Sequence, residues 1–177
     1  MTLQEKIDEP LIFSQGRPGV SMPKIRIIVV GNTKASFLKE GETLYLKRLR
    51  RYTPIEWVEV KPEKITKGTL KERLLALEGL SIEKKFHARD HIIALDVSGR
   101  EYSSEALSKR IERLSWKGNP LCFVIGGPLG ISKEILGRAH ETLSLSKLTL
   151  THEMSRILLL EQLYRAFTIM KGEKYHK

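Results

Sequence analysis

The residues of this 177-residue chain that most suggest chemistry are a histidine and an arginine four positions apart, His152 and Arg156. If a helix begins near His152, this spacing places both side chains on one face. A neutral imidazole accepts a proton near pH 7, and a nearby guanidinium stabilises the anion that is left behind. The pair therefore suits acid–base chemistry, although a histidine at a helix start followed by a surface arginine is the simpler interpretation of these two residues alone.

Two other strand ends, together with the segment 148–152 that contains His152, are candidates for the same site. The apolar run 121–125 ends in a Gly-Gly-Pro turn at 126–128, and another apolar run ends in the polar, glycine-containing segment 95–100. Glycines after a strand let a ligand approach the backbone, but taken alone they favour a tight strand-to-helix turn as the explanation. The basic tail carries Tyr175 and His176, which either stack on RNA or simply end the chain.

Residue spacing disfavours several other kinds of site. No Gly-Lys-Ser/Thr follows the turn at 126–128, and its glycines do not match a dinucleotide fingerprint, so an ATP or nicotinamide site is disfavoured. The remaining histidines have no metal-ligand spacing with one another or with the single cysteine. These residues are His87, His91, His140 and Cys122. No metal site is predicted.

The composition limits the partners and the compartment. With 31 Lys and Arg against 21 Asp and Glu, the net charge of +10 favours a polyanion such as nucleic acid, with a solvated basic surface as the alternative. No apolar run approaches the ~18 residues that a membrane span needs. No signal-peptide pattern opens the chain, and a single cysteine excludes an internal disulfide. A cytoplasmic protein with no membrane segment is predicted.

The elements that must position these residues alternate along the chain, as in a parallel α/β sheet covered on both faces. Strands are predicted at 24–30, 55–60, 91–96, 121–125 and 144–150. Helices are predicted at 35–52 and 70–86, from Ser103 or Ser104 to 116, after Ser132, and at 153–170, with the serines as caps. Ligands of such sheets bind beyond the carboxyl ends of the strands, where the segments above are expected to meet.

Residues 1–23 differ from the rest of the chain. Three prolines and short polar stretches surround a single apolar triplet, and no periodicity lasts beyond one turn. We expect an N-terminal extension that is flexible unless it docks, or non-native, ahead of one domain at 24–177. Met22 is an alternative start of the domain proper.

Taken together, the segments 95–100, 123–130, 143–152 and 161–166 resemble the RlmH family of SPOUT-superfamily methyltransferases. Arg156 and the tail at 172–177 belong to the same resemblance, which covers residues 24–177. Several distant motifs in one order are far more specific than any one of them alone.

The resemblance implies a Rossmann-like α/β fold with a C-terminal trefoil knot, which ordinary topology rules would exclude. It also implies a homodimer, S-adenosylmethionine as methyl donor, and methylation of N3 of a pseudouridine in helix 69 of 23S rRNA on assembled 70S ribosomes. The cofactor positions carried over from the family are Leu95, Gly126, Leu145, Ser146, Lys147, Leu148, Thr149 and Leu150.

For that reaction we expect His152 to remove the N3 proton and Arg156 to stabilise the anionic ring. Tyr175 and His176 are candidates for holding the target base, either from the same subunit or from the partner. A noncatalytic RNA- or ribosome-binding module that keeps the fold and the charge is the alternative function. Binding of S-adenosylmethionine distinguishes the two.

Overall fold

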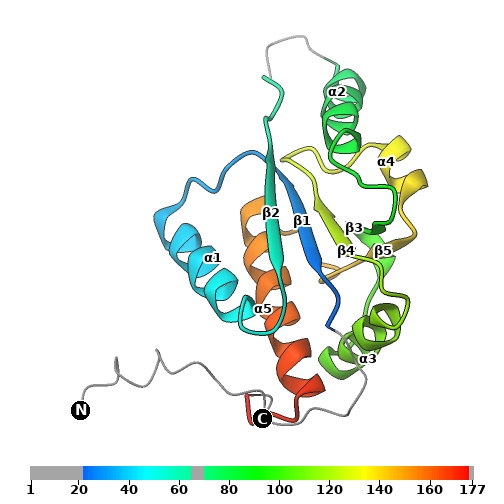
Figure 1. Cartoon of the computed structure of the whole chain (residues 1–177). Helices are drawn as coiled ribbons and strands as arrows, with labels where there is room; N and C mark the ends of the chain where they lie inside the picture. Colours follow the sequence, from blue (N-terminus) through cyan, green and yellow to red (C-terminus); the bar gives the residue numbers. More distant parts are fainter. Residues whose placement is uncertain (1–21, 65–69, 176–177) are drawn as a thin grey trace.

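The computed structural model of the chain describes residues 22–64 and 70–175, in which strands and helices alternate (Figure 1). The strands are β1 (Ile25–Val30), β2 (Ile55–Val60), β3 (His91–Arg100), β4 (Leu121–Ile125) and β5 (Glu141–Leu143). The helices are α1 (Ser36–Leu49), α2 (Lys71–Glu83), α3 (Ser104–Ser115), α4 (Lys133–Arg138) and α5 (His152–Met170). This alternation confirms the predicted α/β class.

The five strands form one parallel sheet in the order β2-β1-β4-β3-β5. From β1 the chain moves outward to β2, whereas β3 and β4 lie on the opposite side of β1. The strand order therefore reverses between β1 and β4. In open parallel sheets, ligands bind beyond the carboxyl ends of the strands at such a reversal.

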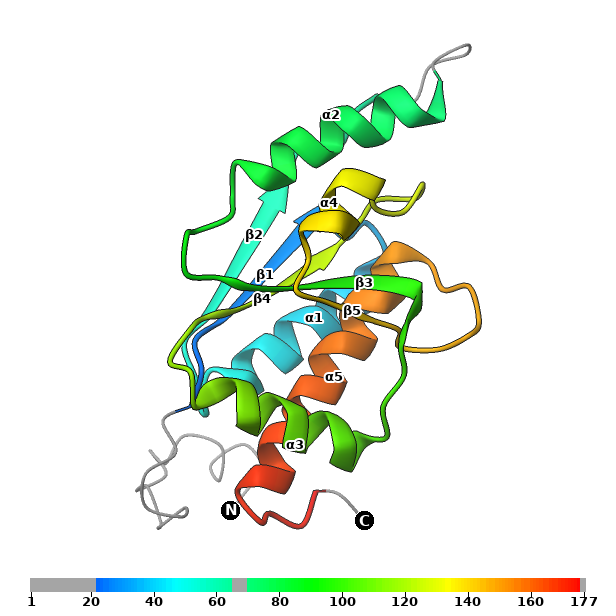
Figure 2. The same ribbon diagram turned by 90° about the vertical axis from the view of Figure 1, so that its right-hand side faces the viewer.

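Helices cover both faces of the sheet: α1, α3 and α5 one face, and α2 and α4 the other (Figures 1 and 2). Alternate side chains of β1 supply the two cores, because successive residues of a strand point to opposite faces. Ile25, Ile27 and Val29 join the core beneath α5, whereas Ile28 and Val30 join the core beneath α2 and α4.

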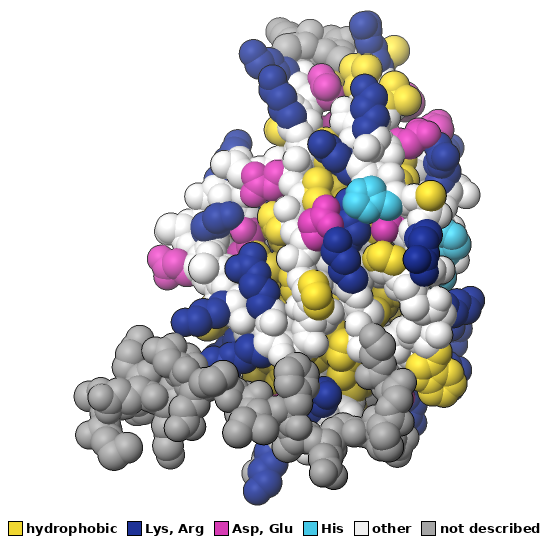
Figure 3. All heavy atoms as spheres, in the orientation of Figure 1, with side chains coloured by type: hydrophobic (Ala, Val, Ile, Leu, Met, Phe, Trp, Pro, Cys, Tyr) yellow, Lys and Arg dark blue, Asp and Glu magenta, His cyan; other side chains and the backbone are white. Residues whose placement is uncertain are grey.

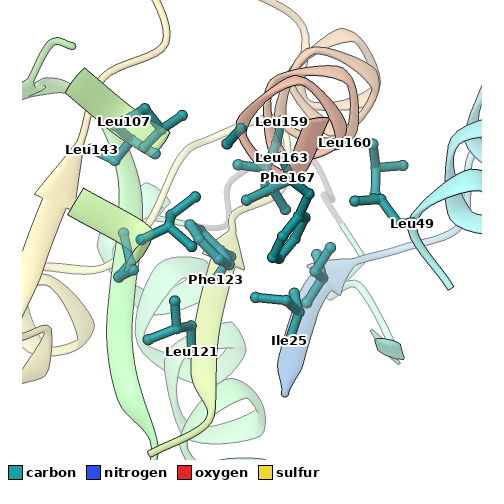
Figure 4. Packing of buried hydrophobic residues seen from close by; sticks show 14 of the residues in the cluster. Ile25, Leu49, Leu107, Leu121, Phe123, Leu143, Leu159, Leu160, Leu163 and Phe167 are labelled. Carbon is teal, nitrogen blue, oxygen red and sulfur yellow. The ribbon is translucent and has the colours of Figure 1, made fainter. Parts of the chain in front are cut away.

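Helix α5 is anchored by the larger core (Figure 4). Leu163 and Phe167 of this helix are fully buried and pack in one cluster with Ile25 and Phe123 of the sheet. Each fully buried side chain of this size contributes about 1.5–3 kcal/mol. The start of α5, which carries His152, is therefore held over the carboxyl edge of the sheet by a well-packed helix.

The prediction of a fifth strand at 144–150 is wrong, because the strand is Glu141–Leu143 and the following residues form an irregular segment. Local bonds explain the difference. The Ser144 hydroxyl donates to the Ser146 carbonyl at 3.0 Å, and Leu148 N–H donates to the Ser146 hydroxyl at 3.0 Å. Serine side chains that bond nearby backbone groups in this way compete with a strand ladder.

Only Met22 and Pro23 of the predicted extension lie within the described residues, and both pack against the domain. Met22 joins the larger core, and the Pro23 carbonyl accepts a hydrogen bond from the Thr53 hydroxyl at 2.6 Å. The domain boundary and the trefoil knot stay predictions. No helix in the described part of the chain is long and apolar enough to cross a membrane.

Candidate active site at the carboxyl edge of the sheet

A cavity of about 860 Å³ opens at the carboxyl edge of the sheet. Its walls come from the ends of β3 and β4, the segment 143–151, the start of α5, and Ala35 and Leu38 at the start of α1. Seven of the eight predicted cofactor positions line it, namely Leu95, Gly126, Leu145, Ser146, Leu148, Thr149 and Leu150. The eighth, Lys147, is exposed and is not among the lining residues.

The turn after β4 forms one side of the cavity, and its glycine is required by the turn itself. A Cβ on Gly126 would lie 2.2 Å from the carbonyl oxygen of Gly130. Gly127 and Gly130 pair across this turn as an antiparallel bridge, with Gly130 at φ +92°. A glycine at 126 is therefore explained by close backbone packing, without any ligand.

The irregular segment 144–150 forms the opposite wall. Leu145 is half-buried against the larger core, whereas 73% of the Leu148 side chain is exposed. The Ser144 and Leu148 N–H groups and the Ser146 carbonyl are bonded within the protein. Because the rest of the segment lies outside the sheet, its other backbone groups can hydrogen-bond a ligand in the cavity. Apolar walls with a few directional polar groups are typical of small-molecule sites.

His152 is the first residue of α5 and lines the cavity. The helix begins here because the Thr151 hydroxyl accepts a hydrogen bond from Met154 N–H at 3.2 Å. Burial lowers the pKa of His152, the positive charge of Arg156 lowers it further, and Glu153 opposes both effects. The imidazole is therefore kept neutral near pH 7, in the form that accepts a proton.

Arg156 lies one helical turn further along α5 and is completely buried, so its guanidinium does not line the cavity. It donates to the Val30 carbonyl at 2.7 Å and to the Thr33 hydroxyl at 2.8 Å. Thr33 in turn donates to Glu42 at 2.6 Å. Burial lowers the pKa of Arg156, and the carboxylate of Glu42 only partly offsets this. The cation therefore acts on the site through space, from behind His152.

Two acidic residues that the sequence analysis passed over complete this arrangement. Helix α1 has no side-chain cap of its own at Ala35, and Glu153 of α5 instead accepts a hydrogen bond from Ala35 N–H at 3.2 Å. Glu42 is buried on α1 in line with Leu38 and Leu46. A charged residue in the apolar stripe of a helix was the signal that would have revealed Glu42.

Tyr175 lies at the other end of α5, away from the cavity. Its hydroxyl donates to Glu161 at 3.4 Å, and its ring meets Tyr164 with centroids 4.7 Å apart. Glu161 lies nine residues beyond His152, which is about 13 Å along the helix axis. Within one chain, Tyr175 and His152 are therefore not brought together. His176 lies outside the described residues.

The donor set agrees with a nucleoside-like cofactor better than with a metal. Among residues 22–64 and 70–175, no group of three His, Cys, Asp or Glu side chains is arranged to hold a metal ion. The cavity instead combines leucine side chains, an open loop backbone and two carboxylates, Asp96 and Glu153. These residues fit S-adenosylmethionine, which has an aromatic base, a ribose and an amino-acid group to be recognised.

Comparison with known proteins identifies the family of the chain. A family model described as a predicted SPOUT methyltransferase matches residues 23–176. A protein of Bacillus thuringiensis (strain Al Hakam), named Ribosomal RNA large subunit methyltransferase H, is 43% identical over 157 residues, covering 86% of this chain and 99% of the relative. A protein of the same name from Bacillus anthracis matches to the same extent.

Solved structures show the same fold at low identity. A putative methylase family protein from Neisseria gonorrhoeae has a TM-score of 0.50 and 12% identity, covering 84% of this chain and 85% of that one. A probable methylase family protein from Haemophilus influenzae Rd KW20 has a TM-score of 0.51 and 14% identity, covering 89% and 70%. With the fold, the cavity and the family match in agreement, the chain belongs to the SPOUT methyltransferases and, within them, to the RlmH family.

Proposed function

We propose that this chain is a cytoplasmic, homodimeric methyltransferase that uses S-adenosylmethionine to methylate N3 of a pseudouridine in helix 69 of 23S rRNA, on assembled 70S ribosomes. The names of its relatives support an rRNA substrate. The target base, helix 69 and the 70S particle rest on the resemblance of the motifs to the RlmH family.

One observation carries the proposal. A neutral histidine lines the same cavity as seven of the eight predicted cofactor positions, at the reversal of strand order in the sheet. Leu95, Leu148 and Leu150 offer apolar contact to the adenine, and the backbone of 145–150 offers hydrogen bonds. We place Lys147 at the rim of this site, where its exposed ammonium meets RNA phosphates.

When bound, S-adenosylmethionine would supply an electrophilic methyl group: the N–CH3 bond forms in line as the sulfonium S–CH3 bond breaks, and S-adenosylhomocysteine leaves with the electron pair on sulfur. The chain's own part is to align the nitrogen with the methyl group and to remove the N3 proton, because nitrogen attacks well only after that proton has left. His152 accepts the proton on its neutral imidazole. Arg156 favours the removal of the N3 proton in two ways. Its charge lowers the pKa of His152, which keeps the imidazole deprotonated, and it stabilises the negative charge that forms on the ring.

The tail requires a second subunit in this mechanism. Within one chain Tyr175 packs on Tyr164 and Glu161, away from His152. We therefore propose that Tyr175 and His176 hold the target base in the site of the partner subunit. Arg165 lies over the Tyr175 ring, with its guanidinium carbon 5.0 Å from the ring centroid, and helps to set the direction of the tail.

The test of the function is methyl incorporation from labelled S-adenosylmethionine into 70S ribosomes that lack the modification, with free 23S rRNA in parallel. Label at pseudouridine N3 of helix 69 in 70S particles supports the proposed cofactor, reaction and substrate together. Cofactor binding without any label means another RNA target or an N-terminal extension that blocks the site. Neither binding nor label would favour the noncatalytic RNA-binding module.

The role of His152 is tested by His152→Ala, with His87→Ala as a matched control because the His87 side chain is exposed. Loss of a general base lowers turnover by about 10²- to 10⁴-fold. Affinity for S-adenosylmethionine, measured by calorimetry, should stay near that of the unmodified protein. Turnover of His152→Ala equal to that of His87→Ala would show that another group removes the proton.

The direction of the tail is tested with two inactive chains. One carries His152→Ala with the full tail, and the other has His152 but ends at Gly172. If the tail acts on the partner, mixed dimers formed by refolding the two together regain activity, because one site has both parts. Mixed dimers that stay inactive would mean that the tail serves its own chain.

A further inference from the structure

A second hollow, of about 470 Å³, lies on the side of the molecule formed by α3 and the edge strand β5. We name it the α3–β5 groove, and eight residues line it. They are Arg100, Tyr102, Ala106, Lys109, Arg110, Arg113, Glu141 and Thr142. Four of these are Lys or Arg and one is acidic, so the groove is strongly positive.

The single carboxylate in the groove does not neutralise it. Glu141 is already bonded by Arg110, at 2.9 Å from Nε and 2.5 Å from an Nη atom, and by His91 Nε2 at 2.7 Å. Among the described residues, neither Lys109 nor Arg113 forms an ion pair, and both are exposed. Two like charges four residues apart on a helix repel each other, which favours an anion bound between them.

Arg100 extends the same positive surface from the end of β3. Its guanidinium carbon lies 5.0 Å from the centroid of the Tyr102 ring, a stacked arrangement that fixes the group and leaves its edge N–H groups free to donate. A fixed planar guanidinium suits bidentate recognition of a phosphate.

The groove and the active-site cavity are neighbours along the same two strands. Residues 95–97 of β3 line the cavity and Arg100 lines the groove, while Leu143 lines the cavity and residues 141–142 line the groove. Leu143 pairs with both Leu95 and Arg100. In Figure 2 the chain descends directly from the end of β3 into α3. A strand of RNA with one base in the cavity can therefore follow the β3–β5 edge into the groove.

Basic residues on another face of the described part of the molecule are arranged differently. On the face in Figure 3, Lys and Arg side chains are spread over α1, β2 and α2, with acidic side chains between them. We propose that the α3–β5 groove binds the phosphodiester backbone of the RNA substrate next to the methylated base, with Lys109 and Arg113 as the principal contacts. This inference rests on the proposed function, since it assumes that the cavity accepts an RNA base.

The test is the salt dependence of binding to a fluorescently labelled stem–loop RNA, followed by anisotropy with the full-length dimer. The variant is Lys109→Gln with Arg113→Gln. If both residues contact phosphates, the slope of log K against log salt concentration decreases by about 0.7 to 0.9 for each contact. Affinity for S-adenosylmethionine should be unchanged, because neither residue lines the cavity.

The matched control is Lys71→Gln with Arg73→Gln, which removes the same charge from exposed positions on α2, at the opposite end of the molecule (Figure 1). An unchanged slope in the groove variant, or an equal decrease in the control, would overturn the proposal. Weaker RNA binding confined to the groove variant supports it even if no methylation is found, in which case only the proposed function fails.

Discussion

Two arginines of this protein are buried to nearly the same degree at opposite ends of β1, and their charges are balanced in opposite ways. Arg26 lies near the start of β1 and Arg156 lies against its end, with exposed fractions of 2% and 0%. The first is surrounded by carboxylates in direct contact, and the second contacts only neutral oxygens.

At the start of β1, the positive charge is cancelled locally. Arg26 is paired with the buried carboxylate of Asp90 and with Glu56 at 3.2 Å, and it also donates to the Lys85 carbonyl at 2.9 Å. Burial alone would lower the pKa of Arg26, but the hydrogen bond to Glu56 and the charge of Asp90 raise it. This end of the sheet is a structural ion-pair cluster.

At the end of β1, the positive charge has no carboxylate in direct contact, and Glu42, Glu153 and Glu59 act on it only through space. Glu42, the carboxylate with the largest effect on the pKa of Arg156, is linked to it through Thr33 and is itself bonded by Lys39 at 2.6 Å. The pKa of Arg156 is accordingly lowered by burial. In the proposed mechanism, the fold therefore neutralises the buried cation at the structural end of β1 and keeps a positive field at the end where an anion would form.

The largest effect that tests this contrast is expected from Asp90→Ala. The variant leaves the buried Arg26 without its closest counter-charge, and removing one partner of a buried ion pair costs about 3–5 kcal/mol. The free energy of unfolding in urea measures this loss. Adding Arg26→Met to Asp90→Ala should restore part of it, and a double variant no more stable than Asp90→Ala would contradict the structural role of the pair.

Arg156→Met is expected to have a smaller effect on stability and a specific effect on catalysis. The Val30 carbonyl and Thr33 lose a donor, which costs about 1–3 kcal/mol, but an uncompensated buried charge is also removed. Because the charge of Arg156 lowers the pKa of His152, its loss should move the acid limb of the single-turnover pH profile to higher pH. A profile that falls uniformly, with no shift, would argue against action through His152.

Glu42→Gln should shift the acid limb of the single-turnover pH profile in the opposite direction to Arg156→Met, and by a smaller amount. The substitution preserves the shape of the side chain but removes the carboxylate charge that partly offsets Arg156. The positive field at the cavity then increases, so the pKa of His152 decreases and the acid limb moves to lower pH. A shift in the same direction as that of Arg156→Met would show that the two variants act through packing.

The smallest effect concerns Glu56 at the structural end. Its pKa is lowered to about 2, from an ordinary value of 4.5, chiefly by the hydrogen bonds from Arg26 and Lys24. The ion pairs therefore stabilise the fold above pH 4.5, and this contribution is lost as the pH falls toward 2. Since 35% of the Glu56 side chain is exposed, the contribution is about 1 kcal/mol.

The measurement for Glu56 is the free energy of unfolding at pH 7 and at pH 3, compared with that of Glu56→Gln. Glutamine cannot lose a charge, so the variant should be less stable at pH 7 and should lose less on acidification. An equal loss in both proteins would place the acid sensitivity elsewhere.

Most elements of the fold were predictable because their signals are local. The β-branched run at β1 and the serines that cap α3 and α4 require only nearby residues, and both caps are confirmed. The segment 144–150 was wrongly predicted as a strand because its apolar and polar residues alternate as they do in a strand. Here alternation arises from a loop whose Leu145 faces the core while Leu148 faces out.

The site was predictable as a set of residues but not as an arrangement. Spacing placed His152 and Arg156 on one face of a helix, yet it could not show that Arg156 is buried, since its acceptors Val30 and Thr33 lie more than 120 residues earlier. Nor could it place Tyr175, whose position depends on packing against Tyr164. Both features depend on contacts between distant parts of the chain.

The hydrogen bond from Ala35 to Glu153 has a consequence for motion. The amide proton of Ala35, at the start of α1, is held by a carboxylate of α5 beside His152. Its exchange with solvent therefore requires the start of α1 to separate from the start of α5. The free energy of that opening depends on both helices. A ligand that holds the start of α5 in place slows this exchange, so the protection of one amide reports on occupancy of the site.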